Sequence, residues 1–465
     1  MWFKELNYLG RHSAEHYFAP FVDAPYSLLL DSGGSDQSNN RYDIILVYPS
    51  DVLLRENDEN IAINIHSGEK ESVANVFDCM NNWLASVETP SFSSNEQLNC
   101  FQTQPFVGGL AGAFAYDLGR TLEKLPDNAI NELKVPDLVT GRYWCPLIID
   151  HQAQKVQLYN FYNLDDTFQR ILNAINSFTA ESDENINHFT MTSDWNSNLT
   201  QQDYAQKFEQ VKNYIRSGDC YQINLAQRFE GHFTGKEWCA YQSLRKLNSA
   251  PFSAYLNFSS GTLMSLSPER FIEVKGRDVQ TQPIKGTRPR GKTPEDDEHL
   301  KAELKNSAKD QAENLMIVDL LRNDLGRTAI AGSVEVTELF GVYSFPSVHH
   351  LISTVRSQIN DTTSAIDVLK SAFPGGSITG APKIRAMEII EELEPHRRHF
   401  YCGSIAYFSF NDKMDSNILI RSIISFEQKL YTWAGGGLVN DSECGLEYDE
   451  TFAKLSKILT PLNEL

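Results

Sequence analysis

The chain has 465 residues, of which 41% are hydrophobic and 11% aromatic. This composition supplies enough apolar side chains for a folded core and excludes a disordered or fibrous protein. Acidic residues outnumber basic ones 61 to 41, and the formal net charge of -20 argues against binding to nucleic acid or to an anionic membrane. An anionic substrate would have to be attracted by local cationic side chains.

The chain shows no sign of membrane insertion or secretion. Apolar runs such as 44–48 are far shorter than the roughly 20 residues needed to cross a bilayer. The segment 1–5 lacks the basic and apolar regions of a signal peptide. The seven cysteines are scattered without a CxxC pair, which favours reduced thiols over disulfides or a zinc site. We therefore expect a cytoplasmic protein.

The first part of the chain has the pattern of a scaffold. Short β-branched and aromatic runs, such as 155–161, alternate with turn-forming clusters and predict strands. The glycine-rich stretch 106–117 indicates close backbone packing. A polar, turn-rich segment at 180–198 predicts a boundary. We therefore divide the chain into an N-terminal scaffold region, 1–198, and a catalytic region, 199–465.

The second part mixes helices and strands without regular alternation. Thr200 and Asp203 form a capping pattern ahead of apolar residues at helical spacing, which predicts a helix ending near Gly218. The other predicted elements are strands at 261–265 and 271–274, a polar loop at 286–297, helices at 298–321 and 382–393, consecutive antiparallel strands at 404–410, 418–426 and 430–433, and a closing helix at 446–459. This mixture predicts an α+β fold with large antiparallel sheets.

Two predicted helices carry paired carboxylates. Glu447 and Glu450 lie one turn apart on the closing helix, and Asp310 and Glu313 repeat that spacing in an otherwise apolar helix. If the two helices converge, these oxygens suit Mg²⁺. The alternative is that both faces are solvated and that Glu450 pairs with Lys454.

Two glycine-rich segments could present backbone N–H groups to an anion. The first, 373–383, contains Ser377 and leads into a helix, and the second contains Gly435, Gly436 and Gly437 at a strand end. Neither matches a nucleotide-binding motif. The alternative for both is an ordinary tight turn.

Three further side chains could carry chemistry. Arg421 alternates with apolar residues, so its guanidinium must meet either a structural acid or a carboxylate ligand. His350 is either a hydrogen-bonded core histidine or a pocket residue. Lys285, at a strand end, is either an exposed lysine or, if desolvated, a nucleophile with Glu269 as its acid–base partner.

Together, several of these segments resemble the chorismate-utilising enzymes over nearly the whole chain. The segments that carry the resemblance, in chain order, are 218–225, 267–271, 283–288, 312–320, 322–327, 380–383 and 447–451. The resemblance implies a large two-sheet antiparallel β sandwich with helices packed on the outside, and a catalytic region that binds chorismate.

Two positions indicate the branch of the family. Anthranilate synthases are similar but carry alanine where Lys285 stands, and isochorismate synthases place a water-activating lysine where this chain has Gln222. Because an amide cannot act as a general base near neutral pH, water is a poor candidate nucleophile. The pattern is similar to the branch that makes 4-amino-4-deoxychorismate from chorismate and ammonia, for 4-aminobenzoate and folate.

The resemblance also implies a role for each candidate residue. Lys285 would attack the ring and Glu269 would protonate the leaving hydroxyl. The implied metal ion is Mg²⁺, on Glu313, Glu450, Glu447 and Asp310. The implied substrate-binding groups are Arg421, Tyr401, His350, Ser377, Gly435, Gly436, Gly437, Lys454 and Thr287.

Ammonia is expected from a separate glutamine amidotransferase subunit, because no cysteine lies in a GxCxG nucleophile elbow. The resemblance further implies a tryptophan pocket, in which Asp31 replaces the glutamate typical of feedback-regulated relatives. The implied pocket residues are Leu30, Asp31, Ser32, Pro251 and Phe252. Two alternatives stay open, namely anthranilate synthase component I and a non-catalytic amino-acid-binding subunit.

Overall fold

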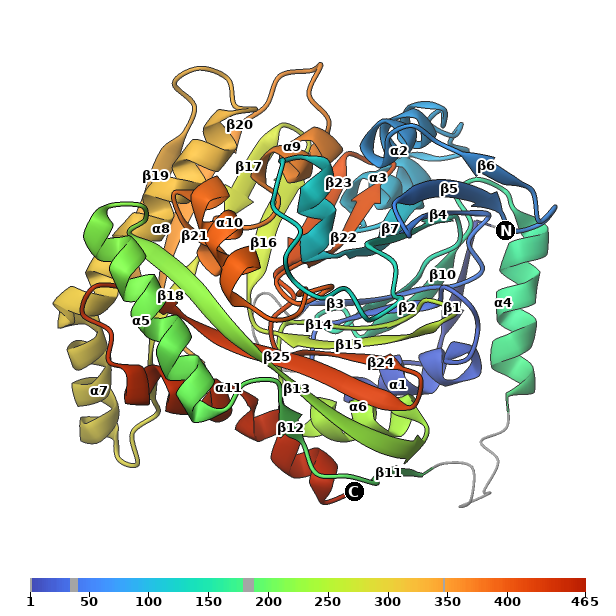
Figure 1. Cartoon of the computed structure of the whole chain (residues 1–465). Helices are drawn as coiled ribbons and strands as arrows, with labels where there is room; N and C mark the ends of the chain where they lie inside the picture. Colours follow the sequence, from blue (N-terminus) through green and yellow to red (C-terminus); the bar gives the residue numbers. More distant parts are fainter. Residues whose placement is uncertain (1, 34–40, 179–187, 346–347) are drawn as a thin grey trace.

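The computed structural model describes residues 2–33, 41–178, 188–345 and 348–465. Two large antiparallel sheets pack face to face, with helices on their outer sides (Figure 1). The predicted α+β class and two-sheet sandwich are therefore confirmed. In the part of the chain that the structure describes, no helix is long and apolar enough to cross a membrane.

The first sheet has 13 strands in its described part. Its longest strand, β13, lies next to the edge strand β11 and pairs with β25 over ten residue pairs. The strands of the main path, in spatial order, are β1 (Phe3–Leu6), β10 (Lys155–Tyr159), β9 (Leu147–Asp150), β3 (Tyr42–Leu46), β2 (Leu28–Asp31), β14 (Phe252–Asn257), β15 (Gly261–Ser267), β24 (Ser422–Phe426), β25 (Lys429–Leu438), β13 (Gln222–Gly235) and β11 (Phe189–Met191). The short strands β12 (Asn196–Ser197) and β21 (Gly380–Ala381) also pair with β13.

The second sheet has 12 strands among the described residues. In spatial order these are β18 (Ile284–Pro289), β20 (Val348–Gln358), β17 (Asp278–Thr281), β16 (Arg270–Lys275), β23 (Lys413–Asn417), β22 (Ser404–Ser409), β7 (Gly109–Phe114), β8 (Leu138–Tyr143), β4 (Asp51–Glu56), β5 (Glu59–Asn64) and β6 (Lys70–Ser72). A further strand, β19 (Glu335–Ser344), pairs with β20.

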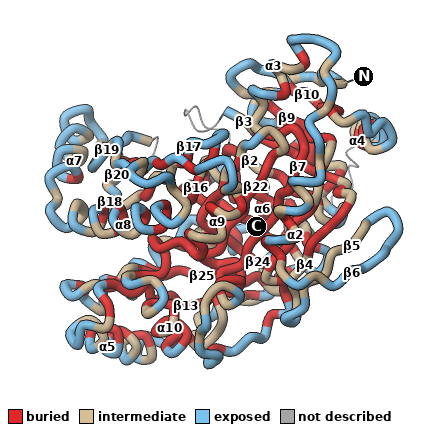
Figure 2. The backbone as a smooth tube through the Cα atoms, turned by 90° about the horizontal axis from the view of Figure 1, so that it is seen from above, coloured by how far each residue is buried: buried red, intermediate tan, exposed pale blue. Residues whose placement is uncertain are grey.

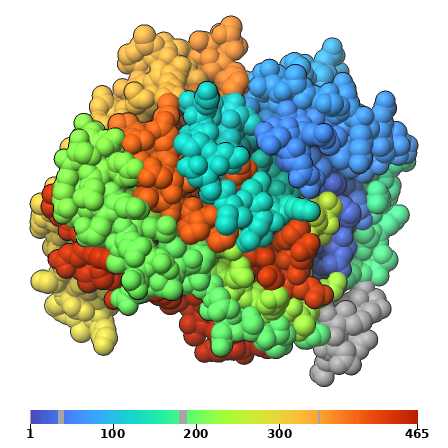
Figure 3. Space-filling view, in the orientation of Figure 1, coloured from blue at the N-terminus to red at the C-terminus, as the bar shows by residue number. Residues whose placement is uncertain are grey.

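Both halves of the sequence contribute to each sheet. β2 pairs with β14 in the first sheet, and β7 pairs with β22 in the second. In the space-filling view, N-terminal and C-terminal residues lie side by side over one face (Figure 3). The division at residue 198 therefore separates segments of sequence that are interleaved in space, and the roles assigned to 1–198 and 199–465 stay predictions. Part of the predicted boundary, 180–187, lies outside the described residues.

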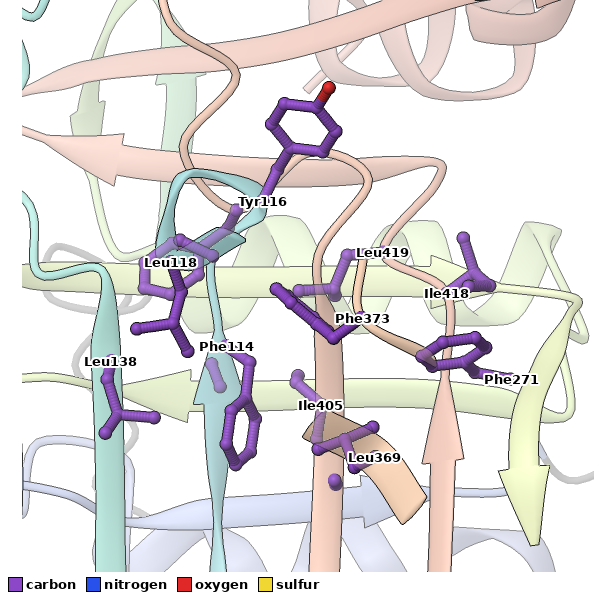
Figure 4. Close-up of a cluster of buried hydrophobic side chains, with 14 of the residues drawn as sticks. Phe114, Tyr116, Leu118, Leu138, Phe271, Leu369, Phe373, Ile405, Ile418 and Leu419 are labelled. Carbon is purple, nitrogen blue, oxygen red and sulfur yellow. The ribbon is translucent and has the colours of Figure 1, made fainter. Parts of the chain in front are cut away.

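The main core lies between the sheets. Phe114, Leu138, Phe271 and Ile405 contribute to it from four different strands, and Phe373 inserts from a loop (Figure 4). The buried chain forms a continuous central band, with exposed segments confined to the periphery (Figure 2). A Cβ at Gly112 would clash with the neighbouring strand β8, which confirms the predicted close backbone packing.

Helices cover the outer faces of both sheets. α1 (Ser13–Phe18), α6 (Glu237–Leu247) and α11 (Cys444–Asn463) pack on the first sheet, and α2 (Val76–Ala85), α8 (Ala308–Gly326) and α9 (Ala365–Ala372) lie on the side of the second. The remaining α-helices are α3 (Asn95–Thr103), α4 (Asp165–Ser177), α5 (Gln201–Ser217), α7 (Pro294–Asn306) and α10 (Lys383–Leu393), and the 3-10 helices are η1 (Gly10–His12), η2 (Ala19–Phe21), η3 (Tyr116–Thr121) and η4 (Gly376–Ile378).

The predicted helix after residue 200 is confirmed. Thr200 and Asp203 form a reciprocal capping box, and Gly218 ends α5 in the left-handed conformation at φ 83°. The predicted helices at 382–393 and 446–459 correspond to α10 and α11.

The prediction of a single helix at 298–321 is wrong. The segment forms two helices, α7 and α8, divided at Ser307, whose hydroxyl accepts a hydrogen bond from the N–H of Asp310. The predicted loop at 286–297 contains the end of β18 and the start of α7. Thr293 and Pro294 supply an N-cap and a first helical residue there, a start signal that the polarity of the segment concealed.

The predicted consecutive strands near the C-terminus are also partly wrong. β22 lies in the second sheet and β24 in the first, and the segment 418–421 crosses between the sheets. Arg421 has a φ of 53°, so it is not part of an alternating strand. The unpredicted strand β23 pairs with β22 instead.

Candidate active site

A cavity of about 500 Å³ is lined by residues of β18, α8, β25 and α11, among other segments. The sequence-predicted catalytic, substrate-binding and metal-binding residues all line it, although they come from distant parts of the chain. These residues are Glu269, Lys285, Thr287, Asp310, Glu313, His350, Ser377, Tyr401, Arg421, Gly435, Gly436, Gly437, Glu447, Glu450 and Lys454.

Lys285 and Glu269 meet on one side of the cavity. Lys285 lies near the start of β18, and its Nζ donates a hydrogen bond to the carbonyl oxygen of Ser377 at 3.2 Å. Glu269 is buried, and its carboxyl group also bonds to the side chain of Ser377 and to the N–H of Ile284. Burial raises the pKa of Glu269, and the nearby Lys285 opposes this rise. The carboxyl group is therefore suited to hold a proton that it can donate.

Arg421 is a partly buried cation at the end of the crossover segment. Burial lowers the pKa of its guanidinium, and no carboxylate lies within ion-pairing distance of it among the described residues. One alternative from the sequence was that a structural Asp or Glu pairs with Arg421. No such partner is present among the residues that the structure describes. A partly buried guanidinium without a counter-ion is suited to bind an anionic ligand.

His350 lines the wall near Arg421. Burial lowers its pKa to about 4, and the positive charge of Arg421 adds to this effect. The imidazole is therefore neutral near pH 7. Its Nδ1 lies 2.9 Å from Oγ1 of Thr287, and it is a pocket residue rather than a core histidine.

Four carboxylates face the cavity from two helices. Asp310 and Glu313 belong to α8, and Glu447 and Glu450 belong to α11. Burial raises the pKa of both Glu313 and Glu447, and the negative charge of Glu447 contributes to the rise at Glu313. These acidic groups therefore repel one another across the cavity.

Cationic side chains partly compensate this negative charge. Lys454 Nζ lies 2.7 Å from Glu450, so the ion pair anticipated as an alternative is present. Arg288 lies 3.0 Å from Asp310, and Lys309 lies 4.0 Å from Glu313.

The residues suit a magnesium ion by their chemistry, not by a preformed cage. Among the described residues, no group of three or more His, Cys, Asp or Glu side chains is arranged to hold a metal. Mg²⁺ commonly keeps several waters and uses only one or two protein carboxylates together with substrate oxygens. Glu313 and Glu447, which are partly buried and mutually repelling, fit that requirement.

The glycines of β25 make room for pocket side chains. A Cβ at Gly436 would lie 2.7 Å from Oε2 of Glu447, and a Cβ at Gly437 would clash with the amide group of Gln222. All three glycines lie within a strand, so the tight turn considered for them is wrong. Lys454 Nζ donates to the carbonyl oxygen of Gly435 at 2.9 Å.

Some lining residues were not predicted from the sequence. Asn224 is buried beside the cavity, and its Nδ2 donates to the carbonyl oxygen of Ile378 at 2.9 Å. Trp433 stacks on Tyr401 with ring centroids 6.1 Å apart and an interplanar angle of 9°. The alternation of Gln222 and Asn224 with apolar residues in β13 was a signal for two polar groups on one face.

A second cavity of about 520 Å³ lies between β2, β14 and β16. Its lining includes all the residues of the predicted tryptophan pocket, namely Leu30, Asp31, Ser32, Pro251 and Phe252. The carboxylate of Asp31 is already bound, because Arg245 donates to both of its oxygens and Tyr241 to one of them. Asp31 is therefore held in a buried ion pair.

The chain is similar to known proteins over nearly its whole length. Residues 28–460 match the family described as chorismate binding enzyme. The chain is 45% identical to aminodeoxychorismate synthase component 1 of Salmonella typhimurium over 464 residues, with 97% of this chain and 96% of the relative covered. It is also 45% identical to aminodeoxychorismate synthase component 1 of Escherichia coli, with the same coverage.

Solved structures give a consistent result. Anthranilate synthase component I from Streptococcus pneumoniae superimposes with a TM-score of 0.78 at 28% identity, covering 91% of this chain and 93% of the other. The menaquinone-specific isochorismate synthase of Escherichia coli superimposes with a TM-score of 0.72 at 16% identity, over 99% and 94% of the two chains. The second likeness shows the shared fold alone.

Proposed function

The chain belongs to the chorismate binding enzyme family and is an enzyme, and we propose that it converts chorismate and ammonia into 4-amino-4-deoxychorismate, a precursor of 4-aminobenzoate and folate. The observation that carries this proposal is the position of Lys285. Its amine shares one cavity with Glu269, with the unpaired guanidinium of Arg421 and with the carboxylates of α8 and α11. The cavity of about 500 Å³ has the volume that a small anionic ring requires.

Lys285 is the proposed nucleophile. Its Nζ forms a bond to C2 of the ring while the bond between C4 and the hydroxyl oxygen breaks and the ring electrons shift. Glu269 supplies the proton with which that oxygen leaves as water, and its raised pKa supports this role. Ammonia then forms a bond to C4 as the bond between C2 and Nζ breaks, which restores the free lysine.

Arg421, Tyr401 and the β25 glycines are proposed to hold the two carboxylates of chorismate. Because the protein as a whole is acidic, a dianion needs such local cations. When bound to Glu313 and Glu450, with Glu447 and Asp310 in support, Mg²⁺ would neutralise the ring carboxylate and polarise the ring.

A separate glutamine amidotransferase subunit is the proposed source of ammonia. The relatives are named as component 1 of a synthase, which supports the existence of a second component. All seven cysteines are free, which supports a reducing compartment such as the cytoplasm.

The test is product identification with the purified chain. Chorismate, Mg²⁺ and an ammonium salt should give 4-amino-4-deoxychorismate by liquid chromatography and mass spectrometry. No fluorescent anthranilate should form. Anthranilate as the product would instead identify an anthranilate synthase, and tryptophan binding without any turnover of chorismate would identify a non-catalytic subunit.

A further inference from the structure

A buried ion pair, Arg398 with Glu394, lies behind the active-site cavity. Arg398 is 1% exposed and Glu394 is 5% exposed, and neither belongs to the cavity lining. Nε and Nη2 of Arg398 donate to the two carboxylate oxygens at 2.9 and 2.7 Å. Since a buried ion pair seldom stabilises a fold more than apolar residues of the same size, its other contacts are informative.

The pair connects two walls of the cavity. Nη1 of Arg398 donates to the carbonyl oxygen of Ile378 at 3.0 Å, and Nη2 donates to that of Asn224 at 2.6 Å. Glu394 accepts a hydrogen bond from the N–H of Ala226 at 2.9 Å. The guanidinium therefore fixes η4 against β13, two segments that are far apart in the sequence.

The 3-10 helix η4 in turn holds the proposed catalytic groups. Ile378 follows Ser377, whose carbonyl oxygen accepts the hydrogen bond from Lys285 and whose side chain bonds to Glu269. The Arg398 guanidinium also lies 5.6 Å from the ring centroid of Tyr401, which lines the cavity. A shift of η4 would therefore displace the acceptor that orients the Lys285 amine.

We propose that Arg398 is a positioning residue, which fixes η4 so that Ser377 holds Lys285 and Glu269 in reactive geometry. The expected effect on turnover rests on the proposed function, whereas the expected effect on the Lys285 environment rests only on the contacts of Arg398 and Ser377. Even a small displacement of reacting groups costs about 100-fold in rate in well-studied enzymes. The guanidinium is suited to this task because one planar group donates to both walls at once.

The first test compares Arg398→Lys with Arg120→Lys. Arg120 forms an ion pair with Glu391, one turn before Glu394 on α10, but it does not line the cavity. It therefore provides a neighbouring arginine–glutamate pair, less buried than Arg398 and Glu394, without the contacts to η4. The readout is the rate at which acetic anhydride labels Lys285 as a function of pH, measured by peptide mass spectrometry without substrate.

Arg398→Lys should shift the pH profile of Lys285 labelling and lower kcat by about tenfold to 100-fold, with a smaller change in KM for chorismate. Arg120→Lys should leave the labelling profile and kcat unchanged, even where it lowers the thermal midpoint equally. An unchanged labelling profile in folded Arg398→Lys overturns the proposal.

A second variant, Glu394→Gln, changes the ion pair while keeping Arg398, so the proposal can be tested even if Arg398→Lys does not fold. Glu394→Gln keeps an oxygen for the N–H of Ala226 and leaves the two carbonyl contacts of Arg398 in place, and it should shift the labelling profile less than Arg398→Lys. A larger shift in Glu394→Gln would assign the effect to the charge of the pair and overturn the proposal. Because labelling needs no substrate, the comparison is decided even if the wild-type chain proves not to make the proposed product.

Discussion

Lys285 differs from the other lysines of the cavity by its partners. Lys454 and Lys309 face carboxylates that offset their charge, whereas Lys285 donates to a carbonyl oxygen beside Glu269, whose pKa is raised by burial. An amine in contact with neutral acceptors is the better nucleophile. The geometry thus distinguishes Lys285, the proposed nucleophile, from two lysines that are paired with carboxylates.

Lys285→Met should therefore abolish covalent capture of chorismate and reduce turnover by about 1,000-fold or more, since no other group replaces the nucleophile. The thermal midpoint should change little because the side chain is only partly buried. Intact-protein mass spectrometry after rapid quenching detects the adduct. Lys292→Met, at an exposed position beyond β18, is the control and should keep both capture and turnover. Full turnover in Lys285→Met would show that the amine is a bystander.

His350 gives a prediction about stability and pH. The folded protein holds this imidazole neutral down to about pH 4, whereas an unfolded chain protonates it below about 6.5. Between these values the unfolded state binds more protons, so the free energy of unfolding falls as the pH decreases, by up to about 3 kcal/mol from this group. The contribution is fully present above pH 6.5.

Removing the imidazole should flatten that dependence. Urea unfolding of His350→Gln, measured from about pH 7 to pH 4, should lose less stability on acidification than the wild-type protein. His66→Gln, at an exposed turn, should retain the wild-type slope. Parallel curves for His350→Gln and the wild-type protein would contradict the lowered pKa of His350 in the folded state.

At the scale of elements, β25 places its glycines where pocket side chains need space. Gly436→Ala should push the Glu447 carboxylate away from the cavity, because a Cβ there meets Oε2 at 2.7 Å. Activity should then require about tenfold more Mg²⁺, as is typical when a group that supports a metal site is displaced.

The matched control is Gly445→Ala on α11. A Cβ at this position meets nothing within 4 Å. Its Mg²⁺ titration should equal that of the wild-type protein, and helix propensity should raise the free energy of unfolding by up to about 1 kcal/mol. If both variants titrate alike, Glu447 does not contribute to the metal site.

Local signals predicted elements well where they were complete, as for α5 with its capping box and its terminal glycine. The division of 298–321 into two helices is not evident from the sequence, because a serine can also lie within a helix. Only the structure shows that the Ser307 side chain caps the start of α8. The crossover at 418–421 was missed because alternation persists for a few residues even where the backbone leaves the sheet. Paradoxically, Arg421 was identified as a ligand-binding candidate from a strand that does not contain it.

At the scale of the molecule, the convergence of the site could not be derived from spacing. Helices α8 and α11 are more than a hundred residues apart, and only the sheet order brings their carboxylates to one cavity with Lys285. Only the resemblance to a family implied that these residues belong to one site. The interleaving of both halves in each sheet was not predicted, because sequence shows composition changes and not strand pairing.

The two cavities share segments of chain. Glu269 lines the active site, and the next residue, Arg270, lines the second cavity. Asn417 lines the second cavity and donates to the carbonyl oxygen of Phe252 at 2.9 Å, while Arg421, four residues later, reaches the first. A ligand of the second cavity would therefore restrain the crossover that carries Arg421.

Tryptophan should consequently stabilise the protein and slow hydrogen exchange at 417–421. At a concentration of about 100 times its Kd, the free energy of unfolding should rise by about 2.7 kcal/mol. Leu30→Trp, which fills the second cavity from β2 without touching the first, should lose both effects and keep turnover of chorismate. Calorimetry without heat of binding, together with an unchanged thermal midpoint, would mean that the cavity takes another ligand. Stabilisation without slower exchange at 417–421 would mean that the two cavities are independent.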